Sequence, residues 1–97
     1  MSSHSINLTW NRDGKEFGYK EYSRDHDLDF GHGVRMRASA AADYLGTAEI
    51  PDPEQAFVAS LSSCHMLTFL ALASLQNLTL ESYTDKAVGY LEKGDAG

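Results

Sequence analysis

The stretch from Asp52 to Gln76 constrains the fold most, because it carries no charged side chain after Glu54. Asp52 can accept a hydrogen bond from a free N–H of a first helical turn, and Pro53 suits the first helical position, where no donor is needed. Glu54 places a negative charge where the helix dipole is positive. Asn77 is a typical residue at a helix end. The stretch therefore predicts one long helix.

The predicted helix carries large apolar side chains on nearly all sides, which predicts that it is buried. These side chains are Phe57, Leu61, Leu67, Leu70, Leu72 and Leu75. Its length of about 33 Å would suffice to cross a membrane. We nevertheless expect no membrane span, because hydroxyl side chains, Cys64 and His65 make the middle of the run polar and no basic flank marks an orientation. A central helix of a soluble protein, covered by a sheet or a partner subunit, explains the pattern better.

The segments before this helix predict short antiparallel strands. Apolar and polar residues alternate over 6–11 and again over 34–39, as in strands with one buried face. Asp13-Gly14 is a strong hairpin signal, with a returning strand that includes Phe17 and Tyr19. Residues 22–30 are expected to be extended.

Glycines then predict a turn at 31–33, and residues 39–51 predict a loop that leads to the helix. After the helix, residues 78–93 predict one long or bent strand, and residues 93–97 a turn. The order of elements predicts an α+β fold in which an antiparallel sheet packs on a long buried central helix.

Length and composition narrow the possible partners. A chain of 97 residues fits one small domain over residues 1–97. A fully apolar helix of this length needs more covering surface than a few short strands supply, so we expect either a homodimer or a chain that lacks a C-terminal part. The net charge of −6 argues against a nucleic-acid partner. No signal peptide is visible, which makes the reducing cytoplasm the expected compartment.

Cys64 is the only cysteine, which excludes an internal disulfide and a zinc site with several thiolates. No glycine-rich phosphate loop and no serine-hydrolase motif occurs, and the four histidines lack metal-ligand spacing, so we expect neither a metal nor a cofactor. A free cysteine in an apolar helix is usually buried and inert. Reactivity of Cys64 would need a cation from elsewhere, because His65 faces away from it on a helix. The available cations are Arg12, Arg24, Arg35 and Arg37, although arginine is more often a solvated surface charge.

Two motifs in this order and spacing resemble the OsmC/Ohr superfamily. Asp52-Pro53-Glu54-Gln55 resembles the Pro-Glu pair at the start of the family's central helix, and Cys64 follows Glu54 by ten residues, as the family's cysteine does. Asn11-Arg12-Asp13-Gly14 resembles the family's turn after its first strand. Residues 22–26 and 81–89 look like a less studied OsmC-like branch.

The resemblance implies a thiol-dependent peroxidase that reduces organic hydroperoxides and is built as an intertwined α+β homodimer. It implies that Cys64 is the peroxidatic cysteine, that Arg12 stabilises its thiolate and that Glu54 holds this arginine, with Arg24 as the alternative arginine. The family normally has a second, resolving cysteine in a C-terminal part. The single cysteine here implies either a fragment or an external thiol reductant.

Two other interpretations stay open at the level of sequence. The chain can be a non-catalytic OsmC-like dimer that binds a small apolar ligand, with Cys64 lining the pocket, because a fold does not determine an activity. It can also be a structural or interaction module in which Cys64 is only part of the core. A regular helix would separate Glu54 from Cys64 by about 15 Å along its axis. An arginine would therefore have to bridge them, or a partner chain would have to complete the site.

Overall fold

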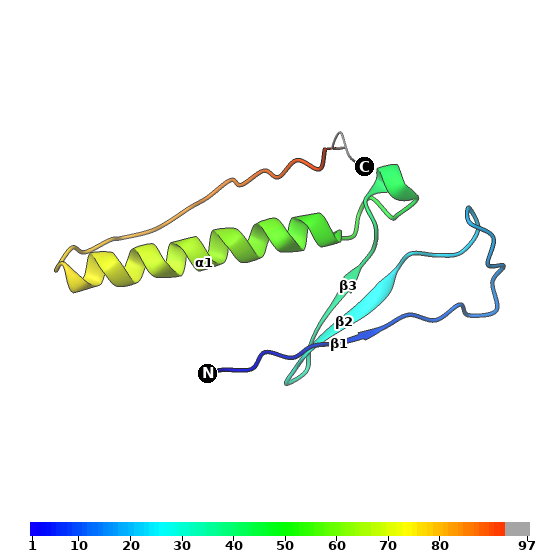
Figure 1. The fold of residues 1–97 in the computed structure, drawn as a ribbon, viewed down its shortest axis with the longest axis horizontal. Helices are drawn as coiled ribbons and strands as arrows, with labels where there is room; N and C mark the ends of the chain where they lie inside the picture. Colours follow the sequence, from blue (N-terminus) through cyan, green and yellow to red (C-terminus); the bar gives the residue numbers. More distant parts are fainter. Residues whose placement is uncertain (93–97) are drawn as a thin grey trace. The chain divides into compact units, whose positions relative to one another are not determined.

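The computed structural model describes residues 1–92, and the chain divides into two compact units, Met1–Pro53 and Glu54–Gly97. The elements are three strands, a short 3-10 helix and one long helix (Figure 1). In chain order they are β1 (Asn7–Thr9), β2 (His26–Gly31), β3 (Val34–Ala38), η1 (Ala42–Tyr44) and α1 (Pro53–Leu75). The predicted α+β class is confirmed. A single domain over residues 1–97 stays a prediction.

The three strands form one antiparallel sheet in the order β1-β2-β3. Leu8 pairs with Leu28, and Leu28 pairs with Met36, so one apolar row crosses the sheet. The opposite face is charged, because alternate side chains of a strand point to opposite faces. There Arg35 Nε lies 3.6 Å from Asp29 Oδ2. The predicted alternation in the third strand is therefore confirmed.

The predicted turn at Asp13-Gly14 is present, but the strand expected after it is wrong. Both residues have positive φ, 53° and 73°, and the Lys15 N–H donates to the Arg12 carbonyl over 3.1 Å. Phe17 instead packs its ring 4.9 Å from that of Tyr22, measured between centroids. A second turn follows at 18–22, and the strand that pairs with β1 begins only at His26. Aromatic packing thus replaces the expected ladder of hydrogen bonds.

The loop between β3 and α1 agrees with the prediction and contains η1. It is fixed at its first residue, because the Ser39 N–H donates to the Pro51 carbonyl over 2.9 Å. Gly46 packs so closely on the backbone of Ala40 that a Cβ would overlap the Ala40 carbonyl. Only glycine fits at this position.

Helix α1 confirms the predicted bounds at both ends. Asn77 adopts a left-handed conformation, with a φ of 61°. The Leu78 N–H donates to the Ala73 carbonyl over 2.9 Å and the Asn77 N–H to the Ser74 carbonyl over 3.0 Å. This pair of bonds is a Schellman motif, which satisfies carbonyls that the end of a helix would otherwise leave unpaired.

The predicted burial of α1 is not achieved by the described residues of this chain. Ala73 is the one buried residue of the helix, and Phe57, Leu61, Leu67 and Leu72 are exposed. Within residues 1–92, α1 alone is long and apolar enough to cross a membrane. This is weak evidence, since core helices of soluble proteins meet the same criterion. The absence of a membrane span stays a prediction.

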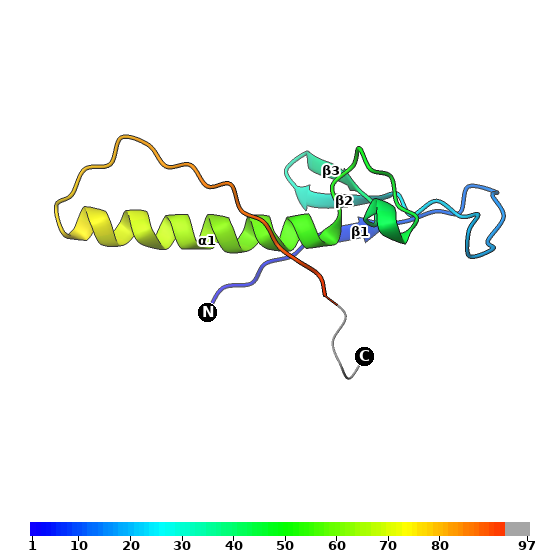
Figure 2. The same ribbon diagram turned by 90° about the horizontal axis from the view of Figure 1, so that it is seen from above.

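The strand predicted over residues 78–93 is wrong for the described part of that range, 78–92. This segment turns back beside α1 (Figures 1 and 2). The Ser62 hydroxyl donates to Asp85 Oδ2 over 2.6 Å, and the rings of Phe69 and Tyr83 lie 6.0 Å apart. A β-strand needs the backbone N–H and C=O groups of a neighbouring strand. The backbone groups of α1 are already paired within the helix, so the segment beside it cannot form a strand with it. The turn predicted at 93–97 lies outside the described residues.

We predict that Asn77→Ala lowers the free energy of unfolding by about 1 kcal/mol, because alanine tolerates the left-handed conformation poorly. Asn77→Gly is expected to leave stability unchanged or to raise it. Urea unfolding followed by far-UV circular dichroism measures both. Gln76→Ala, at the preceding helical position, is the matched control. Equal stability of Asn77→Ala and the control would contradict the role given to Asn77.

Candidate functional site

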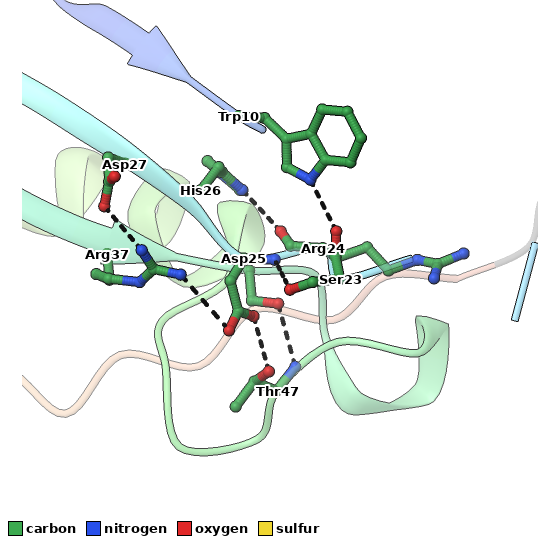
Figure 3. A network of polar contacts seen from close by, with 9 residues as sticks. Trp10, Ser23, Arg24, Asp25, His26, Asp27, Arg37 and Thr47 are labelled. Atoms are coloured by element: carbon green, nitrogen blue, oxygen red, sulfur yellow. Dashed lines mark hydrogen bonds and ion pairs between the residues drawn. The ribbon is translucent and has the colours of Figure 1, made fainter. Parts of the chain in front are cut away.

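A network of polar side chains ties the loop 39–51 to the sheet (Figure 3). Ser39 is fully buried, and its hydroxyl oxygen accepts a hydrogen bond from the Thr47 N–H over 3.1 Å. The Thr47 hydroxyl donates to Asp25 Oδ1 over 2.7 Å. Asp25 therefore anchors the loop through Thr47.

Asp25 also meets a cation on the charged face of the sheet (Figure 3). Arg37 lies 3.7 Å from Asp25 Oδ2 and 3.3 Å from Asp27 Oδ1. The hydrogen bond from the Thr47 hydroxyl lowers the pKa of Asp25 most. The Ser39 hydroxyl and the charges of Arg37 and Lys15 also lower this pKa, while burial acts in the opposite direction. Asp25 thus remains ionised in the folded chain at neutral pH.

An open pocket of about 440 Å³ lies on the apolar side of this same unit. Its walls are mostly apolar, with one arginine and one histidine among them. The lining residues are Leu8, Trp10, Phe17, Tyr22, Arg24, His26, Ser39, Ala40 and Pro53. Its volume falls in the range typical of small-molecule sites.

Three aromatic rings form one wall of this pocket. The ring centroid of Trp10 lies 5.9 Å from that of Phe17 and 6.1 Å from that of Tyr22. The Trp10 indole N–H donates to the Ser23 carbonyl over 2.8 Å (Figure 3). This bond holds the segment before β2 against β1, so the wall is formed without a ligand.

Arg24 lines the apolar pocket and is held in place by its own neighbours. Its guanidinium lies 3.8 Å from the ring centroid of Tyr22 and 5.1 Å from that of Tyr19. Nη1 donates to the Tyr22 carbonyl over 2.9 Å, and Nη2 donates to the Tyr19 carbonyl. These contacts fix the side chain and leave three of its five N–H donors for other partners.

Arg12 lines a different hollow from Arg24. It is exposed, and its Nη1 donates to the Lys15 carbonyl over 2.9 Å. It borders a polar hollow of about 150 Å³ together with Asp25 and Arg37. The two candidate arginines therefore serve different surroundings, one polar and one apolar.

Cys64 is a free, exposed cysteine on α1. Cys64 is therefore not buried by the described residues, unlike a typical inert core cysteine. Glu54, in the first turn of α1, is also exposed, and the two lie about 15 Å apart along this continuous helix. Arg12 and Arg24 belong to the unit Met1–Pro53, whereas Glu54 and Cys64 belong to the other unit. The predicted pairing of an arginine with Cys64 stays a prediction.

Within the described residues, no group of three or more His, Cys, Asp or Glu side chains could hold a metal ion. The expectation that the protein uses no cofactor stays a prediction.

Sequence reasoning missed the anchoring role of Asp25 and the pocket beside it. The alternation of residues 22–29 carries a signal that the prediction of a single extended segment does not use. Tyr22, Arg24 and His26 line the apolar pocket, whereas Asp25 belongs to the polar network. If Arg24 is treated as an amphipathic residue, every second residue of this segment points to the apolar face. The alternation then separates the apolar face from the polar face.

Comparison with known proteins identifies the family. No protein-family model matches the chain, and no curated protein matches it. A solved structure does match, that of an OsmC-like protein of unknown function from Vibrio cholerae O1 biovar eltor. The two chains are 47% identical with a TM-score of 0.89, and the match covers 100% of this chain and 66% of that one. The chain belongs to the OsmC-like superfamily and spans 66% of the length of this relative.

We predict that the pairing of Asp25 makes the unit Met1–Pro53 sensitive to acid. The pKa of Asp25 is lower in the folded than in the unfolded chain, so its ionised form stabilises the fold above the unfolded value of about 4. This stabilisation is lost as the pH falls through the folded value. The free energy of unfolding, followed by Trp10 fluorescence between neutral and acidic pH, measures the loss.

Thr47→Val is expected to flatten this acid dependence, because it removes the largest cause of the pKa shift. Thr9→Val, at an exposed position of β1, is the matched control and keeps the wild-type profile. An unchanged profile in Thr47→Val would show that Asp25 is not the titrating group.

Proposed function

We propose that this OsmC-like protein is a thiol-dependent peroxidase that reduces organic hydroperoxides through Cys64. The observation that carries the proposal is the exposed, free thiol of Cys64 on the long helix, ten residues after Glu54. The superfamily to which the chain belongs supports this assignment, because the resemblance at this helix implies a peroxidatic cysteine. Exposure matters since the sulfur must meet the peroxide directly.

The proposed reaction begins with attack of the Cys64 thiolate on one peroxide oxygen. A sulfur–oxygen bond forms, the oxygen–oxygen bond breaks, and the departing alkoxide takes up a proton to become an alcohol. The cysteine is oxidised to a sulfenic acid and the hydroperoxide is reduced. An external thiol then condenses with the sulfenic acid to give a mixed disulfide and water, and a second thiol restores Cys64. This external reductant is proposed because the chain holds one cysteine.

Arg12 is the arginine that we propose for stabilising the thiolate, with Glu54 holding it and Arg24 as the alternative. Arg12 supports this role through its free donors, since within residues 1–92 its side chain donates one hydrogen bond, from Nη1. Arg24 is already engaged by two carbonyls and two aromatic rings. Completion of the site by a second copy of the chain is part of the proposal.

A homodimer in the cytoplasm, with neither nucleic acid nor membrane as partner, is the proposed setting. The apolar side chains exposed along α1 support a protein partner, because apolar surfaces of this extent are usually covered by another chain. The net charge of −6 agrees with the absence of a nucleic-acid partner.

The apolar pocket favours a second candidate function, which is the binding of a small apolar ligand without catalysis. The pocket is mostly apolar, has a volume of about 440 Å³, and lies in the unit Met1–Pro53, which lacks Cys64. The two candidates differ in whether Cys64 reacts.

The peroxidase proposal predicts that an organic hydroperoxide adds one oxygen atom to the protein at Cys64. Intact mass spectrometry after brief treatment with cumene hydroperoxide measures the adduct, and dimedone traps it as a sulfenic acid. Cys64→Ser is expected to show no adduct. Ser63→Ala, the adjacent exposed position on α1, is the matched control and reacts like wild type. Absence of an adduct on folded protein would leave only the binding function.

The proposal also predicts that Arg12→Gln slows oxidation of Cys64 by roughly 10²-fold, as expected when a charge-stabilising donor is removed. Arg35→Gln, which alters an exposed arginine on β3, is expected to have no effect. Stopped-flow measurement of the second-order rate constant compares these variants with Arg24→Gln. A loss confined to Arg24→Gln would transfer the role to Arg24, and no loss in either variant would contradict an arginine-assisted thiolate.

A further inference from the structure

Arg24 is a half-buried cation without a carboxylate partner in the part of the chain described, residues 1–92. The ion pairs in this range join Arg35 to Asp29, and Arg37 to Asp25 and Asp27. Arg24 instead meets two backbone carbonyls and two tyrosine rings. Within residues 1–92 the guanidinium therefore meets the partial negative charges of carbonyls and rings, and it has no full negative charge opposite it.

The guanidinium of Arg24 borders the apolar pocket, and its position there is fixed. The pocket walls near it are the rings of Trp10, Phe17 and Tyr22. Nη1 donates to the Tyr22 carbonyl and Nη2 to the Tyr19 carbonyl, which leaves three N–H groups for a ligand. Binding would therefore need little reordering of this side chain, which preserves affinity.

His26 adds a second polar group to the same pocket. Its Nδ1 lies 2.9 Å from the Arg24 carbonyl, so Nδ1 must carry the proton and donate (Figure 3). The other ring nitrogen, Nε2, is then an acceptor in the neutral ring. In this neutral form His26 offers no donor to an anion, so Arg24 is the group that matches a single anionic group, while the mostly apolar walls match an apolar body.

We propose that this pocket binds a small molecule that has an apolar body and one carboxylate, with the carboxylate paired to Arg24. The apolar body packs against Trp10, Phe17 and Leu8. This inference rests on the second candidate function, apolar ligand binding, and adds the charge that the ligand carries. It does not involve Cys64. A planar guanidinium pairs well with a carboxylate through parallel hydrogen bonds.

The test compares decanoate with decanamide, which has the same chain and a neutral head group. Titration of the full chain, followed by Trp10 fluorescence, measures both dissociation constants below the micellar concentration. Decanoate is expected to bind about tenfold more tightly than decanamide, since the pair is charge-assisted but the pocket is open to water. Equal affinities would overturn the carboxylate inference and leave apolar binding intact. Binding of neither compound would overturn both.

Arg24→Gln is expected to bind both compounds equally, and Arg24→Lys to retain part of the preference for decanoate. Arg35→Gln removes the same charge from β3, outside the pocket lining, and is the matched control that keeps the full preference. Far-UV circular dichroism confirms that each variant is folded. Cys64→Ser is expected to bind decanoate like wild type, whatever the outcome of the peroxide experiment. An equal loss of preference in Arg35→Gln and Arg24→Gln would show a general charge effect and overturn the site.

Discussion

Ser39 joins the sheet to the loop that precedes α1, and the fold of residues 1–53 depends on how its polar groups are satisfied. The residue is fully buried, so an unpaired N–H or hydroxyl there would cost about 1–3 kcal/mol. The Pro51 carbonyl accepts its N–H, and the Thr47 N–H donates to its hydroxyl oxygen. Thr47 in turn donates to Asp25. Three short contacts thus connect the end of β3, the loop and the segment before β2.

This polar junction separates two surroundings that lie only one residue apart along the chain. Asp25 belongs to the charged network, whereas Arg24 lines the apolar pocket, and Ser39 borders both. The separation follows from the alternation of side chains along an extended backbone.

Sequence reasoning succeeded where the signal was local. The helix bounds, the Asp13-Gly14 turn, the turn at 31–33 and the third strand each follow from a few neighbouring residues. The OsmC-like family was also recognised from spacing within the sequence. It failed at Phe17, where packing against aromatic rings five and seven residues away replaces a strand, and over 78–92, where a strand would require a neighbouring strand.

The candidate site shows the same division. Cys64 and Glu54 could be named because they sit at a recognisable spacing on one helix. The anchoring role of Asp25 depends on Thr47, a residue 22 positions away, and no local pattern connects them. The apolar pocket likewise collects residues from β1, β2 and the loop, which only the tertiary structure brings together.

The extended segment 78–92 has a consequence for the behaviour of the protein at high concentration. Its residues from 79 onward make no backbone hydrogen bond to another described residue, while Leu80, Val88 and Tyr90 are exposed. An exposed apolar stretch with free amide and carbonyl groups can template intermolecular β-pairing. The charges of Glu81, Asp85 and Lys86 interrupt it and act as gatekeepers against aggregation. Colloidal stability of this segment thus depends on charged residues that contribute little to hydrophobic packing.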